Sequence, residues 1–334
     1  MTMSMITLPG SNLNISPLCY GAGSWGSTVR DAELEQLYST YRAAGGNAFD
    51  TAHCYAFWVD VDGVSGEGTS AKGTSAEGAS ERAVGECIRK FERRRQDVVV
   101  ITKGGHPTVP PKYPKPDAYL SPEVIRKDLS ESLERLQMDC VDLYFLHRDD
   151  TRVPVGEIID TLAEHVSAGR IRQIGASNWS TARIAEANAY AKSHGRPAFV
   201  ASQVQWSLAE PTKHYGTTDS SPRSLSDADV RWHTESNLAV LAYTPTAGGF
   251  FASGGARDAG FDNPVARERL ARAQRLAKEL GGTVNQIALA YLRSHPFPCV
   301  PILGTTQLDH LTDALGAAKI RLTPQQVAWL RSKN

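Results

Sequence analysis

Three apolar runs in the sequence each end in an ionisable residue, and a tyrosine follows one of them. Asp50 ends the run NAFD, Lys103 ends VVVITK and His147 ends VDLYFLH, while Tyr55 lies five residues after Asp50. A free phenol, with a pKa of about 10, is a poor acid at neutral pH. A neighbouring ammonium group lowers that pKa, and a carboxylate beside the ammonium holds it in place. A tyrosine tuned in this way could protonate a carbonyl oxygen, or take the proton from an alcohol, while a neutral imidazole orients the oxygen.

The elements needed to bring these residues together are predicted by the alternation of short β-type runs with helical patterns. The predicted strands are 18–21, 47–50, 98–102, 141–146, 171–176, 199–204, 238–243 and 300–303. The predicted helices are 31–44, 80–91, 121–136, 154–168, 180–194, 226–236, 266–280, 284–294 and 308–317. Two shorter runs, 6–8 and 13–15, flank a Pro-Gly-Ser-Asn turn and predict a hairpin. Ser80 and Ser121 are the expected N-caps of their helices, and Pro122 suits the first helical position.

Eight β/α units in this order predict an α/β fold, a (β/α)₈ TIM barrel with an N-terminal β-hairpin. No linker divides the chain, so we expect residues 1–334 to form one domain. The carboxyl ends of all barrel strands share one face, where barrel enzymes hold their catalytic groups. Asp50, Lys103 and His147 should therefore meet at this mouth of the barrel, with Tyr55 within reach.

Two loops after strands have unusual compositions and should also border the mouth. Residues 62–79 read DGVSGEGTSAKGTSAEGA, a Gly/Ser-rich insertion, and residues 104–120 are rich in proline. The insertion could cover the substrate, meet another subunit of a homo-oligomer, or form a solvated spacer. All three readings remain open from the sequence.

The composition argues against several classes of partner. Lys+Arg and Asp+Glu balance at 36 each, so no basic surplus indicates a nucleic-acid partner. The five cysteines are scattered without a C-x-x-C pair, which fits a reducing compartment. The start MTMSMITLPG does not read as a secretory signal, and no run approaches 18 apolar residues. We therefore expect a cytoplasmic protein that does not span a membrane.

Four segments together resemble the aldo-keto reductase family, and the resemblance covers nearly the whole chain. GGNAFDTAHCY resembles the family signature G-x-N-x-x-D-T-A-x-x-Y, and ITKGG resembles the strand that carries a catalytic lysine. DCVDLYFLHRDD resembles the strand that carries a catalytic histidine, and GRIRQIGASNWS resembles the fifth strand with its Ser-Asn pair. The resemblance implies a tetrad in which Tyr55 is the general acid/base, Lys103 and Asp50 tune its pKa, and His147 orients the carbonyl.

The same resemblance implies a nicotinamide cofactor. Ser177, Asn178 and Gln203 match the positions that bind the carboxamide, Tyr243 matches the aromatic residue that stacks on the ring, and Thr244, Gly248 and Gly249 match the loop over the pyrophosphate. The segment 301–315 resembles the one that binds the adenosine 2′-phosphate, where family members that prefer NADPH often place Lys or Arg. This chain instead offers Gly304, Thr305, Thr306, Gln307 and His310, followed by Asp313-Ala314. We expect NADP(H) on family grounds, and NAD(H) remains possible.

Aromatic and polar residues in or beside the predicted mouth are candidates for binding substrate. They are Trp25, His53, Phe57, Trp58, His106, Arg148, Trp179, Trp206 and Phe250, with Asp149 and Asp150 next to Arg148. Aromatic platforms flanked by polar groups suit a polyol, a ketosugar or a sugar aldehyde. An aliphatic or aromatic aldehyde is the alternative small-molecule substrate.

Three other readings fit the sequence less well. GAGSWG at 21–26 matches the dinucleotide-binding G-x-G-x-x-G, but the predicted helix begins several residues after the last glycine. A barrel metal hydrolase could use Asp50, His53, His147 and Asp149, although Lys103 would then lie unfavourably beside the metal. A cofactor-binding accessory subunit with little turnover is the third reading, and a complete tetrad disfavours it.

Overall fold

Eight parallel strands close into a barrel in this computed structural model, which describes residues 3–59, 76–109, 113–212, 221–257 and 259–332. The strands are β3 (Cys19–Gly21), β4 (Ala48–Asp50), β5 (Val99–Gly104), β6 (Val141–Leu146), β7 (Ile171–Ser177), β8 (Phe199–Gln205), β9 (Ala239–Tyr243) and β10 (Cys299–Leu303). Neighbours in the chain are neighbours in the barrel, and β10 pairs with β3 to close it. The predicted (β/α)₈ fold is confirmed.

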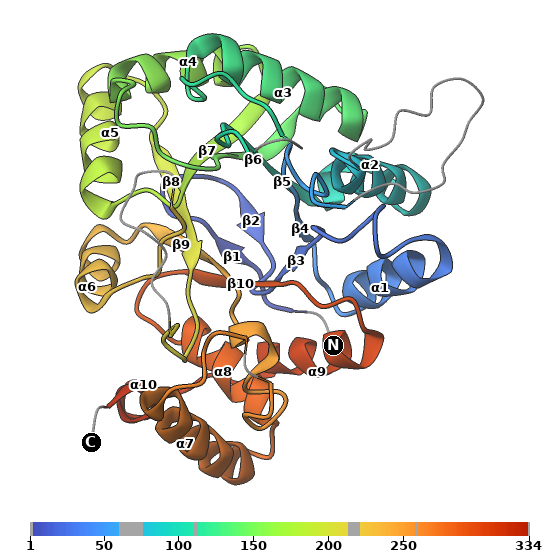
Figure 1. Ribbon diagram of the computed structural model, residues 1–334, viewed down its shortest axis with the longest axis vertical. Helices are drawn as coiled ribbons and strands as arrows, with labels where there is room; N and C mark the ends of the chain where they lie inside the picture. Colours follow the sequence, from blue (N-terminus) through green and yellow to red (C-terminus); the bar gives the residue numbers. More distant parts are fainter. Residues whose placement is uncertain (1–2, 60–75, 110–112, 213–220, 258, 333–334) are drawn as a thin grey trace.

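Helices surround the barrel, as Figure 1 shows. They are α1 (Asp31–Ala43), α2 (Ala79–Phe91), α3 (Pro122–Leu136), α4 (Val155–Ser167), α5 (Thr181–Ser193), α6 (Asp227–Ser236), α7 (Pro264–Leu280), α8 (Val284–Arg293), α9 (Leu308–Gly316) and α10 (Pro324–Arg331). The last of these was not predicted. It begins with a capping box, in which Thr323 and Gln326 satisfy each other's backbone amides, and it packs on α7.

The N-terminal hairpin closes one end of the barrel. Its strands β1 (Ile6–Thr7) and β2 (Asn14–Ile15) pair antiparallel, and in Figure 1 the hairpin lies across the centre of the barrel. Leu8 and Leu13 are buried in one cluster with Cys19 and Leu143, whose side chains fill the barrel interior. The hairpin thus covers one end of the barrel, and the opposite end, where the strands terminate, is the one at which barrel enzymes hold their catalytic groups.

Two predicted helix caps have different outcomes. Ser121 caps α3 as expected, since its hydroxyl accepts a hydrogen bond from the Val124 amide. Ser80 does not cap α2, which begins after Gly78. Its buried hydroxyl instead donates to the carbonyl of Ala22 and lies 2.6 Å from Thr51 Oγ1. Ser80 thereby fastens the start of α2 to the residues that follow β3 and β4.

Most of the predicted insertion, residues 62–75, lies outside the described residues. The chain on either side of it is held together, because the Ala76 amide donates to the Val59 carbonyl and the Gly78 amide donates to the Tyr55 carbonyl. Among the helices of the described ranges, none combines the length and apolar character needed to cross a bilayer.

Candidate active site

The ends of β4, β5 and β6 bring the four predicted residues together at the barrel mouth. Lys103 is buried, and its Nζ lies 2.8 Å from Asp50 Oδ2, 2.7 Å from the Thr51 carbonyl and 3.0 Å from the Tyr55 hydroxyl. Each of the three ammonium protons therefore has a partner. Because the neighbouring strands are in register, with Asp50 opposite Ile101 and Lys103 opposite Phe145, the side chains meet without any loop rearrangement.

The electrostatic balance at Tyr55 differs from the sequence-based prediction. Burial raises the pKa of the Tyr55 phenol, and Lys103 opposes this rise without reversing it. Burial likewise disfavours the charged form of Lys103, but Asp50 and Tyr55 outweigh burial and raise its pKa. The predicted lowering of the Tyr55 pKa is thus wrong in its net direction, because the site is drier than the sequence could indicate. Lys103 acts against burial and lowers the pKa of the phenol relative to what burial alone would give.

His147 lies beside Tyr55, with their ring centroids 5.8 Å apart. Burial, together with the nearby cations and His106, holds the pKa of His147 well below its usual value, so its imidazole is neutral. The Sγ of Cys54 lies 3.5 Å from His147 Nδ1. Burial raises the pKa of the Cys54 thiol to about 12, so the thiol keeps its proton and is able to donate it to Nδ1. In the tautomer in which Cys54 is the donor, His147 Nε2 carries the ring proton.

Backbone strain gathers around this mouth. Among the described non-glycine residues with positive φ, Ala56 follows Tyr55, Asn178 follows β7, and Thr244 and Ala247 follow β9. Non-glycine residues seldom adopt this conformation, and the energy it costs has to be supplied by the surrounding structure. The loops that follow β4, β7 and β9 thus each contain a residue in a conformation that non-glycine residues seldom adopt.

A cavity of about 620 Å³, here called the mouth cavity, runs from the tetrad across the end of the barrel to α9. Its lining includes Asp50, Tyr55, Tyr243, Thr244, Gly248, Gly249, Gly304, Thr305, Thr306, Gln307, His310 and Asp313. At Gly304 no atom lies within 4 Å of the position that a Cβ would take, so this part of the wall is open. The volume suits a dinucleotide-sized ligand.

One cation of the mouth cavity was missed in the sequence. Arg257 lines the cavity, and its side chain lies beside Gly249, where an added Cβ would come 3.4 Å from Arg257 Cδ. The feature of the sequence that could have indicated it is an arginine within the glycine-rich segment after β9. The donors along the cavity also include Asn285, at the start of α8. A guanidinium, amide groups and hydroxyls form a donor set that fits a phosphorylated cofactor.

Asp313 has a structural duty besides lining the cavity. Its carboxylate accepts hydrogen bonds from Thr283 Oγ1 and Asn285 Nδ2, both at 2.8 Å. It therefore fixes the start of α8 and aims the Asn285 amide.

Ser177, Asn178 and Gln203 lie buried between the tetrad and Tyr243. Gln203 Nε2 donates to Asp50 Oδ1 at 2.8 Å, and the Tyr243 hydroxyl donates to Asn178 Oδ1 at 2.8 Å. Asn178 Nδ2 also donates to Ser177 Oγ at 2.9 Å. These polar side chains join the carboxylate of the tetrad to the aromatic ring at the end of β9.

Four of the predicted substrate residues surround the tetrad. The rings of Phe57, Trp58 and His106 lie close to one another or to Tyr55 and His147, with Trp58 half exposed. Arg148 follows His147 and donates from Nη1 to its carbonyl. Desolvation, helped by Arg148, lowers the pKa of His106 to about 4, so this imidazole is also neutral.

The other aromatic candidates do not face the mouth, and their predicted role is corrected. Trp25 turns back from the loop after β3 and packs against Tyr20 and Phe49, with ring centroids 4.9 and 5.7 Å away. Trp179 packs against Phe199, and Trp206 packs against His295, with ring centroids 5.4 and 4.6 Å apart. All three tryptophans are buried in the hydrophobic core, as is Phe250. A residue next to a strand end can be drawn into the layer between barrel and helices, and the apolar rings gain more from burial there.

The ligand set considered for a metal hydrolase is not assembled. Asp50 binds Lys103 and Gln203, whereas His53 contacts Tyr113 and Glu131 at 2.9 and 2.6 Å on the side of α3. Asp149 is paired with Arg183. Asp50 and His147 belong to the tetrad, whereas His53 and Asp149 have their contacts outside it.

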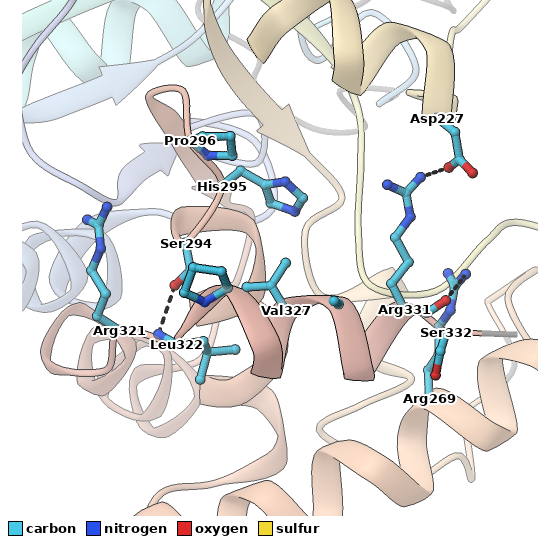
Figure 2. A pocket seen from close by; sticks show the side chains of 12 residues that line it. Asp227, Arg269, Ser294, His295, Pro296, Arg321, Leu322, Val327, Arg331 and Ser332 are labelled. Atoms are coloured by element: carbon cyan, nitrogen blue, oxygen red, sulfur yellow. Dashed lines mark hydrogen bonds and ion pairs between the residues drawn. The ribbon is translucent and has the colours of Figure 1, made fainter. Parts of the chain in front are cut away.

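A second cavity, of about 840 Å³, lies away from this site. Figure 2 shows its lining, which includes Asp227, Arg269, His295, Arg321, Leu322 and Arg331. We call it the C-terminal cavity, because α10 forms one of its walls. None of the predicted site residues lines it.

Comparison with known proteins identifies the class to which this fold and site belong. A model of the Aldo/keto reductase family matches residues 17–334, and the chain belongs to this family of oxidoreductases. It is 28% identical over 337 residues to the uncharacterized oxidoreductase YrpG of Bacillus subtilis (strain 168), covering 98% of this chain and 95% of that protein. The crystal structure of the thermostable aldo-keto reductase Tm1743 with the inhibitor epalrestat shares the fold, with a TM-score of 0.69 at 22% identity over 98% of this chain and 99% of that one.

Proposed function

We propose that this oxidoreductase interconverts a small carbonyl compound and its alcohol, with Tyr55 as the general acid/base. The observation that carries the proposal is the position of Lys103 Nζ, which contacts both the Asp50 carboxylate and the Tyr55 hydroxyl. An isolated buried phenol would hold its proton too tightly to exchange it near neutral pH. The ammonium stabilises the phenolate that forms when the proton leaves, and Asp50 keeps the ammonium charged.

The cofactor we propose is NADP(H), with NAD(H) as the alternative, and when bound it supplies or accepts the hydride. Tyr243, Asn178 and Gln203 would hold the nicotinamide end, since they lie next to the tetrad. Gly249 and Arg257 would hold the pyrophosphate, and Thr305, Thr306 and His310 the adenosine end.

During reduction, Tyr55 gives its hydroxyl proton to the carbonyl oxygen, and Lys103 stabilises the phenolate that remains. His147 would orient the same oxygen by donating from Nε2, which carries the ring proton in the tautomer in which Cys54 donates to Nδ1. In the reverse direction the Tyr55 phenolate accepts the proton of the alcohol. Phe57, Trp58 and His106 would bind the rest of the substrate, for which we favour a sugar aldehyde, ketosugar or polyol.

The test is to titrate the purified protein with NADPH and with NADH, following protein fluorescence, and then to assay a panel of sugars and simple aldehydes. Tighter NADPH binding would support the hydroxyl and histidine donors of segment 301–315 as a 2′-phosphate site. Equal or tighter NADH binding would instead support a dehydrogenase of a sugar or polyol. Arg257→Ala should weaken both cofactors by a similar factor, because both contain the pyrophosphate. Failure to bind either cofactor would overturn the proposal.

A further inference from the structure

Cys54, His106 and His147 form a cluster that the proposed reaction uses only in part. One ring nitrogen of each histidine and the Sγ of Cys54 all lie within 4.8 Å of one another. The two imidazole rings are 4.8 Å apart between centroids, in an edge-on arrangement. Cys54 and His147 are buried, while His106 is half-buried and opens the cluster toward the outside.

The ligand types and spacing match a soft divalent cation. Thiolate and imidazole are the ligands that Zn²⁺ prefers, whereas Mg²⁺ and Ca²⁺ require oxygen ligands. Metal–ligand distances of about 2.3 Å for sulfur and 2.0–2.1 Å for nitrogen put S and N about 3.6 Å apart in a tetrahedral site. The observed distance from Cys54 Sγ to His147 Nδ1 is 3.5 Å. This pair needs almost no movement to bind one ion.

His106 is already oriented in the manner of a metal ligand. Its Nδ1 lies 2.8 Å from the Pro107 carbonyl, which can only accept a hydrogen bond. The ring proton is therefore on Nδ1, and Nε2 keeps the lone pair that a metal requires. A carbonyl that fixes the tautomer of a ligating histidine is a recurrent feature around protein metal sites.

We propose that Cys54, His106 and His147 bind one Zn²⁺ ion at the substrate end of the mouth, and that this ion blocks the reaction reversibly. Binding forms an S–Zn bond, breaks the S–H bond of Cys54 and releases that proton to solvent, with no change of oxidation state. Three protein ligands leave the fourth position open to water. Lys103 and Arg148 lie nearby and oppose a dication, so the affinity should be below that of a structural four-ligand site.

The inhibitory part rests on the proposed function, whereas the binding part does not. Zinc on Nδ1 of His147 leaves the ring proton on Nε2, so the ion would not remove the proposed donor. It would instead block the substrate by occupying space beside the rings of His147 and Tyr55, which lie 5.8 Å apart between centroids. Zinc should therefore compete with the carbonyl substrate.

Metal binding is tested on protein freed of metal by chelation, titrated with Zn²⁺ by calorimetry and with Co²⁺ by absorption spectroscopy. We expect one ion per chain, and for Co²⁺ a sulfur-to-metal charge-transfer band. Cys54→Ala should remove that band, and both Cys54→Ala and His106→Ala should weaken Zn²⁺ binding roughly 10- to 100-fold or more. Cys140→Ser is the matched control, since Cys140 precedes β6 whereas His147 follows it, and its binding should equal that of the wild type. Absence of binding, or binding that survives both alanine variants, would overturn the site.

Inhibition is tested on turnover, with each variant compared with its own metal-free rate. Zn²⁺ should inhibit the wild type competitively with the carbonyl substrate, the chelator should reverse it, and Mg²⁺ should have no effect. Cys54→Ala should need a higher Zn²⁺ concentration by the same factor as its loss of affinity. Stoichiometric binding without inhibition would overturn the inhibitory role. If the wild type binds zinc in the titration but turns over no carbonyl compound when free of metal, the proposed function is refuted while the metal site is supported.

Discussion

The mouth cavity and the C-terminal cavity both contain ionisable side chains, but only one of them directs these side chains at a common point. The C-terminal cavity is the larger, at about 840 against 620 Å³. Two of its arginines are engaged by the protein itself: Arg331 pairs with Asp227, and Arg269 donates to the Leu208 carbonyl and to Glu210. In Figure 2 the Arg331–Asp227 pair crosses one side of the cavity.

At the mouth, by contrast, the charges form a chain that ends at a group able to exchange a proton. Asp50 holds Lys103, Lys103 contacts the Tyr55 hydroxyl, and Tyr55 lines the cavity. His147 at the mouth and His295 at the C-terminal cavity show the same contrast. His147 is kept neutral by burial with surrounding cations, whereas for His295 burial alone lowers the pKa to about 4. Convergence of groups, rather than cavity volume, marks the candidate site.

The strongest test of this difference is Tyr55→Phe. Removing the only proposed proton donor should lower turnover by roughly 10²- to 10⁴-fold, the usual contribution of general acid–base catalysis. Cofactor binding, measured by fluorescence quenching, should persist because the ring remains in place. Near-normal rates in this variant would refute the assignment of Tyr55.

Lys103→Met should have the second-largest effect on turnover. The variant loses the group that stabilises the phenolate, so turnover should fall by roughly 10²-fold or more. It also leaves the buried Asp50 carboxylate without its ion-pair partner, which should lower the free energy of unfolding by about 3–5 kcal/mol. Steady-state kinetics below the new melting temperature separate the two effects. Full activity across neutral pH would contradict the tuning role.

His295→Leu tests the other cavity through stability. His295 Nε2 is buried without a hydrogen-bond partner among the described residues. Between pH 6.5 and about 4 the unfolded chain binds a proton at His295 that the folded chain does not, so wild-type stability falls as the pH falls. This group accounts for a loss of roughly 3 kcal/mol over that range. The free energy of unfolding of the variant, measured by denaturant titration at each pH, should fall by correspondingly less across this range. If it fell with pH as steeply as that of the wild type, the burial argument would be contradicted.

Arg331→Ala should have the smallest effect. The Arg331–Asp227 pair is partly exposed, and such pairs contribute about 0–1 kcal/mol to stability. Thermal unfolding should therefore change little, and kcat/KM should remain at the wild-type value. A large loss of activity would show that the C-terminal cavity takes part in the reaction, and would contradict the conclusion that only the mouth cavity holds the reacting groups.

The fold and the tetrad could be predicted from the sequence for the same physical reason. A strand of known length that ends in a polar residue fixes the height of that residue in the barrel, so Asp50, Lys103 and His147 had to meet. The tryptophans could not be placed in this way. Trp25 and Trp179 follow strands through short loops, and nothing local decides whether a loop side chain points to solvent or back under a helix.

Two further misses concern the surroundings of a residue rather than its position. The degree of burial of Tyr55 depends on packing from several loops, so the net direction of its pKa shift was not readable from residue types. Arg257 lies in a segment without strand or helix periodicity, and its approach to Gly249 depends on the turn after β9. Long-range packing thus decides the details that strand order leaves open.

The backbone hydrogen bond between Val59 and Ala76 makes the geometry of the site independent of the length of the chain between them. The chain leaves and returns at adjacent points, and both points are tied by hydrogen bonds close to Tyr55. Doubling the length of a loop adds only about 0.6 kcal/mol to the entropic cost of closing it. Changes in the length of the segment between these two points should therefore leave Tyr55 in its place, which makes the junction tolerant of insertions and deletions.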